Sequence, residues 1–351
     1  MEKPVAILDP QWRRIDELFT REDFQKLGEV CELVWGRDGH MPESMFEENI
    51  GRARFYLAAN PLIDSNRVAA AHKLQAIIEL YGAFPDTVDY SACFSRGIEV
   101  LSTGPGMRNS VAEMAIAMAL AGARGLVQEH ENFRRGTENW FSDNDATDFS
   151  LYGADVGFVG FGQIARECTR LLAPFAPNIT AYDPWVDPEL AKDHGVRLVS
   201  LDEVARSSRC LFVTAAPTRS NRGMLDATTI GKLPHRALVV VVSRAHVVDS
   251  AALLDAVRAG KVRAAIDVHP VEPPPLDDPV RMLPDVILSP HRAAAVEHGR
   301  QLMGHLIVED IGRMMEGLPP ANLARARAET IQELAGVQHS KKLEDMCEVR
   351  S

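Results

Sequence analysis

The alternation of short apolar runs with helix-compatible segments is the feature that most limits how this chain can fold. Within residues 155–289 the runs are DVGFVG, NITAYD, RCLFVTAA, ALVVVVS, RAAIDV and DVILS. Short, continuously apolar runs are typical of strands that are buried on both faces of a parallel sheet. Helical patterns lie between them, such as DSAALLDAVRAG, which starts at capping residues Asp249 and Ser250 and ends at Gly260. The alternation predicts a doubly wound sheet with right-handed crossovers.

A second series of this kind, less regular, occupies the first hundred or so residues: VAIL, CELVW, RFYLAA, LQAIIEL and IEVLS. The chain has 351 residues, enough for two domains with separate cores. We therefore predict an α/β fold of two doubly wound parallel-sheet domains with a cleft between them. One is a Rossmann cofactor domain over residues 107–317, and the other is a smaller flavodoxin-like substrate domain over 1–106 and 318–351.

Two long helices are expected to join these domains. The first covers 110–136, where Ser110 and Glu113 have the spacing of a capping box, and the second covers 293–317. For the charged tail 325–351 three alternatives stay open: a helix, a dimer arm or a disordered segment.

Charge and composition argue against several classes of protein. The formal net charge of -11, without a local basic cluster, disfavours nucleic-acid binding. The longest apolar runs are shorter than the about 20 residues that cross a bilayer, and the first residues, MEKPVAILDPQWRR, do not look like a signal peptide. Five scattered cysteines without a C-x-x-C motif fit reduced thiols. We expect a cytoplasmic protein with no metal and no membrane partner.

The segment VGFVGFGQIARE carries the spacing G-x-G-x-x-A at Gly160, Gly162 and Ala165, between a strand pattern and a helix pattern. Gly160 permits a tight turn, and Gly162 lets a pyrophosphate approach the amides at the helix N-terminus. The next strand ends in Asp183, whose carboxylate suits ribose hydroxyls and repels a 2′-phosphate, so NAD is favoured over NADP. The alternative, a glycine turn and a strand-end aspartate without a ligand, stays open on these residues alone.

Three polar side chains follow successive predicted strands: Arg244, Glu272 and His291, the last at the first turn of the expected second helix. Taken singly, each has an ordinary explanation as a salt-bridging arginine, a solvated glutamate or a capping histidine. Together they suit hydride transfer to or from a 2-hydroxy acid. Imidazole can move the hydroxyl proton, a carboxylate beside it stabilises its protonated form and fixes the ring, and guanidinium binds a substrate carboxylate through two hydrogen bonds.

From about residue 68 to 313 the chain resembles the D-isomer-specific 2-hydroxyacid dehydrogenase family. The resemblance rests on the ordered series YGAFPDTVD, GIEVLSTGPGMRNSVAE, VGFVGFGQIARECTRLLAPFAPNITAYDP, VVVSRAHVVD, AIDVHPVEP and SPHRAA. It implies an NAD-dependent oxidoreductase that interconverts a small D-2-hydroxy acid and its 2-oxo acid. His291 would be the acid and base, Arg244 would bind the carboxylate, and Glu272 would tune His291. Homodimers built on the cofactor domain, and no metal, are implied as well.

The resemblance also assigns further residues. The implied cofactor contacts are Gly160, Gly162, Gln163, Ile164, Asp183, Pro217, Ser243 and Asp267. Among them, Ser243 would lie beside the nicotinamide and Asp267 would hold its carboxamide. The backbone amides of Gly82 and Ala83 would bind the substrate carboxylate.

Two positions depart from the family pattern. Phe84 replaces a glycine of the substrate loop, and its benzyl group is expected to shrink or reshape the carboxylate site. Arg292 follows the histidine where the family tends to have an apolar residue, and it either recruits a second anionic group or is solvated. Corepressors of the C-terminal binding protein type share this scaffold, so an NAD(H)-sensing protein without significant turnover is the alternative function.

Overall fold

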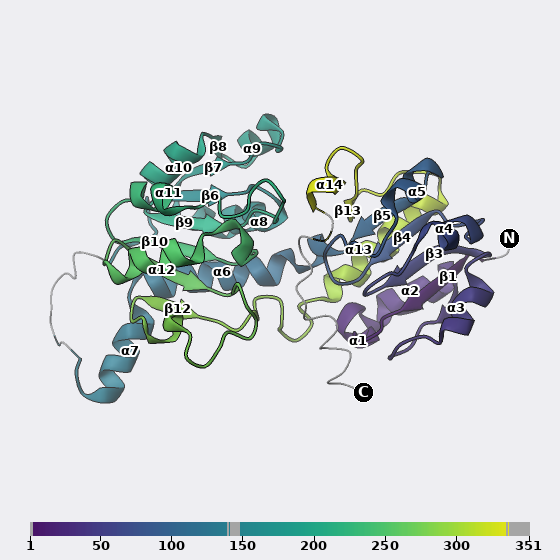
Figure 1. The fold of residues 1–351 in the computed structure, drawn as a ribbon, viewed down its shortest axis with the longest axis horizontal. Helices are drawn as coiled ribbons and strands as arrows, with labels where there is room; N and C mark the ends of the chain where they lie inside the picture. The colour runs from purple at the N-terminus through teal and green to yellow at the C-terminus, as the bar shows by residue number, and fades with distance from the viewer. Residues whose placement is uncertain (1–2, 139, 141–147, 335, 337–351) are drawn as a thin grey trace. The chain divides into compact units, whose positions relative to one another are not determined.

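The structure, a computed structural model, describes residues 3–138, 140, 148–334 and 336 (Figure 1). Contacts divide the chain into two compact units. Unit 1 comprises Met1–Arg108 and Ala295–Ser351, and unit 2 comprises Asn109–Ala294. Each unit has its own sheet, as the two series of apolar runs predict.

The sheet of unit 1 has the strand order β13-β5-β4-β3-β1-β2. The strands are β1 (Val5–Asp9), β2 (Glu32–Trp35), β3 (Ala53–Ala58), β4 (Ala76–Glu79), β5 (Glu99–Ser102) and β13 (Ala324–Arg325). The first five pair in parallel and correspond to the five predicted runs, whereas β13 pairs antiparallel with β5.

Both faces of this sheet are covered by helices. They are α1 (Ile15–Leu18), α2 (Arg21–Val30), α3 (Glu43–Asn49), α4 (Ser65–Ala70), α5 (Tyr90–Ser95), η1 (Gly104–Met107), α13 (Gln301–Met315) and α14 (Ile331–Leu334). Alternate residues of β1 face opposite sides, as the period of two requires. Ala6 and Leu8 pack in one core with residues of α1, α2 and α13, whereas Val5 and Ile7 pack in another with residues of α3, α4 and α5.

The sheet of unit 2 is fully parallel, in the order β12-β11-β10-β9-β6-β7-β8. The strands are β6 (Asp155–Val159), β7 (Asn178–Tyr182), β8 (Arg197–Leu198), β9 (Cys210–Val213), β10 (Ala237–Val241), β11 (Val262–Ile266) and β12 (Val286–Leu288). Because β6 has β7 on one side and β9 on the other, the chain order reverses between β6 and β9. Ligands of doubly wound sheets bind at such a switch point, at the carboxyl ends of the strands.

The first two helices of unit 2 precede β6 in the sequence, and the others lie between its strands. The helices are α6 (Arg108–Ala123), α7 (Leu126–Arg135), α8 (Gln163–Leu172), η2 (Ala173–Phe175), α9 (Pro188–Asp193), α10 (Leu201–Ser207), α11 (Ala227–Lys232), η3 (Ala245–Val247), α12 (Ser250–Arg258) and η4 (Pro279–Met282). The helix predicted between Asp249 and Gly260 is confirmed as α12, with Asp249 as its N-cap and Gly260 in the left-handed region. Helix α6 packs so closely on the sheet that a Cβ at Gly122 would lie 2.8 Å from the side chain of Leu238.

The expected long helix 110–136 differs from the structure at both the start and the middle. Helix α6 begins at Arg108 directly after the single turn of η1, which has Pro105 near its start, so the predicted capping box at Ser110 and Glu113 is wrong. The helical run then breaks at Gly125, which has a left-handed φ of 59°, and α7 follows.

The second expected helix starts later than predicted, at Gln301 instead of 293. This helix, α13, packs with α1 and α2 on the sheet of unit 1, and the contacts group all residues from Ala295 onward with that unit. This grouping differs from the predicted boundary at 317. Most of the tail for which alternatives were left open, residues 337–351, lies outside the described residues.

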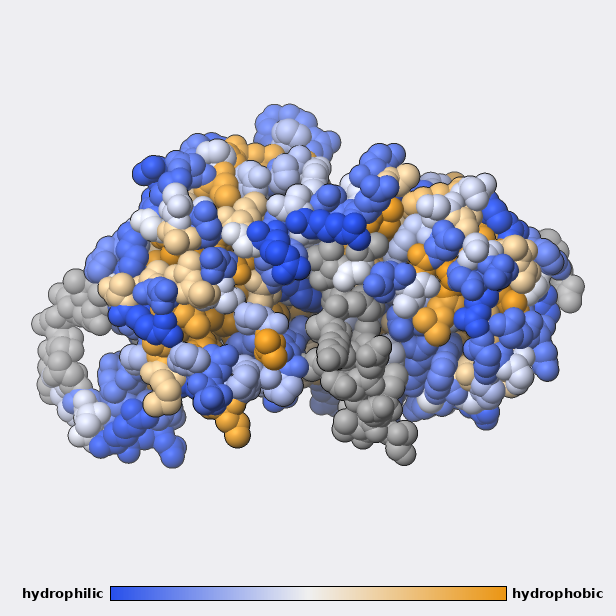
Figure 2. Space-filling view, in the orientation of Figure 1, coloured by the Kyte–Doolittle hydropathy of each residue, from blue (hydrophilic) through white to orange (hydrophobic). Residues whose placement is uncertain are grey.

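The surface carries both hydrophobic and hydrophilic side chains. On the face shown in Figure 2, groups of hydrophobic residues lie among hydrophilic ones. Over the described ranges, no helix taken singly has the length and apolar character needed to span a membrane; Gly104–Ala123 and Leu126–Arg135 meet those criteria as a pair, with a bend of 58°.

Candidate active site

The turn between β6 and α8 requires glycine at its first position. Gly160 has φ 88°, and a Cβ there would lie 2.3 Å from the Cα of Ala215, so no side chain fits. Gly162 is the N-cap of α8, and a Cβ there would have no neighbour within 4 Å. The Cβ position of Gly162 therefore faces open space, which leaves room for a pyrophosphate beside the backbone at this helix N-terminus. The predicted contact residues Gln163 and Ile164 form the first turn of this helix.

Asp183 follows β7 directly and lies against the glycine turn. Its Oδ2 accepts a hydrogen bond from the N–H of Phe161 at 2.8 Å, and its Oδ1 accepts from Trp185 and Val186. The carboxylate is thus fixed beside the turn. Three of the about four acceptor positions of an ionised carboxylate are thus used, and Oδ2 retains capacity for another donor.

The three predicted catalytic residues follow three neighbouring strands. Arg244 comes after β10, Glu272 after β11 and His291 after β12, and these strands are adjacent and parallel in the sheet. The carboxyl ends of parallel strands lie at one edge, so the topology brings the three loops to the same edge of unit 2, the edge that also carries Gly160 and Asp183.

His291 and Glu272 form a direct pair. Nδ1 of His291 lies 2.7 Å from Oε2 of Glu272, with side-chain exposures of 32% and 12%. The other carboxylate oxygen accepts from the N–H of His269 at 3.0 Å, which fixes the orientation of Glu272. Because a carboxylate only accepts, this contact favours the tautomer with the hydrogen on Nδ1, which leaves Nε2 as the nitrogen that can accept a proton.

The loop that carries His291 is held by Asp267. This aspartate is fully buried, and its carboxylate accepts hydrogen bonds from Ser289 Oγ at 2.5 Å, Arg292 N at 2.9 Å and Ala293 N at 3.1 Å. Its backbone oxygen accepts from the N–H of His291 at 2.8 Å. Asp267 therefore positions the histidine loop, while the expectation that it holds the nicotinamide carboxamide stays a prediction.

His291 does not begin a helix, which corrects the prediction. Its φ is 52°, in the left-handed region, and the next helix starts ten residues later at Gln301. The N–H groups of Arg292 and Ala293, which would otherwise lie in the first turn of a helix, donate to the carboxylate of Asp267. The segment after His291 therefore folds as a turn around this carboxylate. The neighbouring Arg292 is exposed, in line with the solvated alternative.

Arg244 and Ser243 lie at the end of β10. The guanidinium of Arg244 donates to the backbone oxygen of Ser243 at 2.7 Å, and no acidic side chain of the described chain forms an ion pair with it. The hydroxyl of Ser243 is buried and has no hydrogen-bond partner among the described residues. Pro217, after β9, is buried as well. An unsatisfied buried hydroxyl is costly unless a ligand supplies its partner.

These features fit a dinucleotide. The glycine turn admits backbone approach, the Cβ position of Gly162 is open, Asp183 can receive a hydroxyl group, and Ser243 offers an unused polar group at the strand edge. Among the described residues, no group of three or more histidine, cysteine, aspartate or glutamate side chains is placed to hold a metal ion.

In unit 1 the loop after β4 carries the predicted substrate-binding residues. The N–H groups of Gly82 and Ala83 both donate to Oε2 of Glu79, each at 2.8 Å. Phe84 is buried in the hydrophobic core with Ile63 and Val88, so its ring packs inward instead of reshaping the loop surface as expected. The role of Gly82 and Ala83 in binding a substrate carboxylate stays a prediction.

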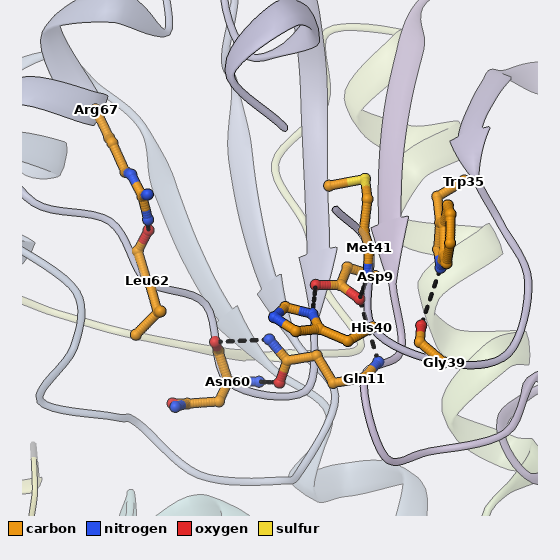
Figure 3. A network of polar contacts seen from close by, with 9 residues as sticks. All are labelled: Asp9, Gln11, Trp35, Gly39, His40, Met41, Asn60, Leu62 and Arg67. Carbon is orange, nitrogen blue, oxygen red and sulfur yellow. Dashed lines mark hydrogen bonds and ion pairs between the residues drawn. The ribbon is translucent and has the colours of Figure 1, made fainter. Parts of the chain in front are cut away.

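A second buried carboxylate ends β1 at the same edge of this sheet (Figure 3). Asp9 accepts from the N–H of Met41 at 2.9 Å and lies 2.9 Å from Nδ1 of His40, while Gln11 and Asn60 exchange two hydrogen bonds. The sequence reasoning missed both Asp9 and Glu79. The available signal was an acidic residue at the end of a strand whose other residues are apolar, in VAILD and AIIE.

Comparison with known proteins places this geometry in a family. Residues 116–293 match the family model described as "D-isomer specific 2-hydroxyacid dehydrogenase, NAD binding domain". A glyoxylate reductase from Korarchaeum cryptofilum is 30% identical over 265 residues, which are 74% of this chain and 79% of that protein. A D-3-phosphoglycerate dehydrogenase from Archaeoglobus fulgidus is 35% identical over 261 residues, 74% of this chain and 49% of that protein.

Solved structures agree with this placement. A crystal structure of a phosphoglycerate oxidoreductase from Rhizobium etli has a TM-score of 0.82 and 35% identity, and the match covers 93% of this chain and 100% of that one. The match covers about half the length of several of the D-3-phosphoglycerate dehydrogenases that the chain resembles.

Proposed function

The chain belongs to the D-isomer specific 2-hydroxyacid dehydrogenase family, and on this premise we propose that it interconverts a small D-2-hydroxy acid and its 2-oxo acid. The matched model is that of an NAD binding domain, so the cofactor is NAD. When bound, NAD accepts a hydride from the hydroxy acid or returns one to the oxo acid. The homodimer and the cytoplasmic location implied by the resemblance stay predictions.

The pairing of His291 with Glu272 at 2.7 Å is the observation that carries this proposal. In the oxidising direction Nε2 of His291 accepts the proton of the substrate hydroxyl. The imidazolium that forms is stabilised by the carboxylate on Nδ1, as in other acid–base pairs of this kind. In the reducing direction the same nitrogen donates the proton to the carbonyl oxygen.

Arg244 binds the substrate carboxylate. Its guanidinium has five N–H donors, of which one is used by the oxygen of Ser243, and a carboxylate accepts two of them side by side. The positive charge close to the substrate also polarises its carbonyl group. This arrangement accounts for a preference for acids with the reacting carbon next to the carboxylate.

The proposal is tested by mixing the purified chain with NADH and a panel of 2-oxo acids, glyoxylate through phosphohydroxypyruvate, and following NADH absorbance. We expect turnover with at least one acid. Tight binding of NADH without turnover of any acid would contradict the proposal and favour the NAD(H)-sensing alternative.

The role of His291 is tested by His291→Ala. The change removes the proton acceptor and should lower kcat by about 10²- to 10⁴-fold with NADH affinity retained. His298→Ala is the control, since His298 is exposed and pairs with the exposed Glu297. Equal turnover of the wild type and His291→Ala rules out the acid–base role.

A further inference from the structure

The carboxyl group of Glu79 lies inside a cradle of hydrogen-bond donors. Glu79 is the last residue of β4 and is fully buried. One of its oxygens accepts from the N–H of Tyr81, and the other accepts from Gly82 at 2.8 Å, Ala83 at 2.8 Å and the hydroxyl of Ser102 at 3.3 Å. Three consecutive backbone N–H groups thus converge on one side chain, in the way that backbone nests bind anions.

The backbone around the cradle is closely packed. Gly82 has φ 90°, and a Cβ there would lie 2.3 Å from Cε of Met107 and 3.3 Å from Cα of Gly104. Gly104 in turn donates from its N–H to the hydroxyl of Ser102 at 3.3 Å. The loop is therefore held in one conformation by packing on one side and by Glu79 on the other.

Each backbone N–H has a single hydrogen. Two of the four donors that Glu79 uses, the N–H groups of Gly82 and Ala83, are those that the resemblance assigns to the substrate carboxylate. A substrate carboxylate could take them only by displacing a buried side chain that already satisfies them. The side chain of Glu79 and the carboxylate of a substrate therefore compete for the same N–H groups, those of Gly82 and Ala83.

We propose that Glu79 is a specificity-determining positioning residue whose carboxyl group fills the amide cradle of residues 81–83 in place of a substrate carboxylate. The loop is thereby ordered without substrate, and the carboxylate of the substrate depends on Arg244. The cradle itself is a carboxylate site that becomes accessible when the Glu79 side chain is removed. That the carboxylate kept out of the cradle is that of a substrate rests on the proposed function. That the side chain of Glu79 fills the cradle does not depend on the proposed function.

The test is the binding of formate to the full chain with Glu79→Ala, followed by the amide resonances of Gly82 and Ala83 in ¹⁵N-labelled protein. We expect saturable shifts confined to residues 81–83 in the variant and none in the wild type. Formate well above its Kd should also raise the Tm of the variant by about 2 to 4 °C and leave the wild type unchanged. Equal responses in the wild type, or a folded variant that does not respond, overturn the proposal.

Glu79→Gln keeps the test decisive should the alanine variant not fold. Its side-chain oxygen can still accept from Gly82 and Ala83, while its NH₂ group faces the donor of Tyr81. We expect a shifted Tyr81 amide, unchanged Gly82 and Ala83 amides, and no response to formate. Binding of formate to the amides of Gly82 and Ala83 in this variant overturns the proposal. Since none of these readouts needs turnover, their outcome is separate from that of the enzyme assays.

Discussion

At the scale of single residues, buried carboxyl groups at strand ends order the loops that follow. Glu79 accepts the amides of the loop after β4, and Asp267 accepts those of the loop after β12 that carries His291. Both side chains are fully buried. Such a group replaces the hydrogen bonds that a helix or strand would supply, at the cost of removing a titratable group from water. The stability of the loop after β4 is therefore expected to depend on pH.

Burial raises the pKa of Glu79 from 4.5 to about 8, although its four hydrogen bonds act in the opposite direction. Arg13 and Tyr90 also interact electrostatically with it. Because the folded chain binds this proton more tightly than the unfolded chain, the contribution of Glu79 to stability is greatest below pH 4.5 and is lost as the pH rises through 8.

We therefore predict a decreasing free energy of unfolding between pH 5 and 8, with a slope from Glu79 of up to about 1.4 kcal/mol per pH unit. Glu79→Gln should remove this slope, measured by urea unfolding at several pH values. Glu48→Gln, which removes an exposed charge from the same unit, is the control and should keep the slope. An identical pH profile for the wild type and Glu79→Gln contradicts the prediction.

The pair of His291 and Glu272 leads to a prediction for the reaction. Glu272→Gln removes the charge that stabilises protonated imidazole, and reduction of a 2-oxo acid requires that form. We expect kcat for reduction to fall by about 10- to 100-fold and the pH–rate profile to move to lower pH, measured in the NADH assay. Glu297→Gln, at an exposed glutamate that also pairs with a histidine, should change neither. A lower kcat with an unmoved profile points to a packing role for Glu272 instead.

At the scale of elements, the turn between β6 and α8 contains two glycines with different roles: Gly160 is required by the fold, and Gly162 leaves space for the cofactor. Gly160→Ala places a methyl group against the backbone of Ala215 at a left-handed φ, which we expect to destabilise the folded chain by about 2 to 5 kcal/mol. Gly162→Ala adds a methyl group in open space, and we expect normal stability with NADH affinity lowered by about 10-fold or more. Thermal unfolding and NADH titration of both variants check this contrast. Normal NADH affinity in Gly162→Ala would show that the turn does not receive the pyrophosphate.

The strands were predictable because a strand buried on both faces needs a continuous apolar run, and each of the eleven predicted runs overlaps a strand. Strands β8 and β13 have only two residues, too few to produce such a pattern. Helix ends were less predictable, since they depend on groups distant in sequence. The start of α13 is delayed past the turn around Asp267, and no local pattern near residue 293 shows that carboxylate.

For the candidate site, the identities of the residues were predictable from the sequence, whereas their conformations were not. Arg244, Glu272 and His291 could be named because parallel strands carry functional residues at their carboxyl ends, and the family resemblance assigned the roles. Their conformations could not be named, because the left-handed φ of His291 follows from tertiary hydrogen bonds. Glu79 was missed because an acidic residue after an apolar run marks the end of a strand but does not show whether its side chain is buried.

At the scale of the whole molecule, the chain passes between the two units only twice, at 108–109 and at 294–295. Each unit has its own sheet and its own hydrophobic core. Units organised in this way can unfold as separate cooperative transitions. The residues assigned to NAD all lie in unit 2, so a ligand there stabilises that unit directly through mass action.

We therefore predict two transitions in calorimetry of the full chain, of which NADH moves one. At about 100 times its Kd, NADH should stabilise unit 2 by about 2.7 kcal/mol and raise its Tm by roughly 5 to 10 °C. The transition of unit 2 is identified independently, because Gly160→Ala should lower that transition alone and Glu79→Gln should alter only the other. A single transition that shifts with NADH, with Gly160→Ala and with Glu79→Gln would show that the two units unfold as one. If NADH instead shifts the transition that Glu79→Gln alters, the cofactor site lies outside unit 2.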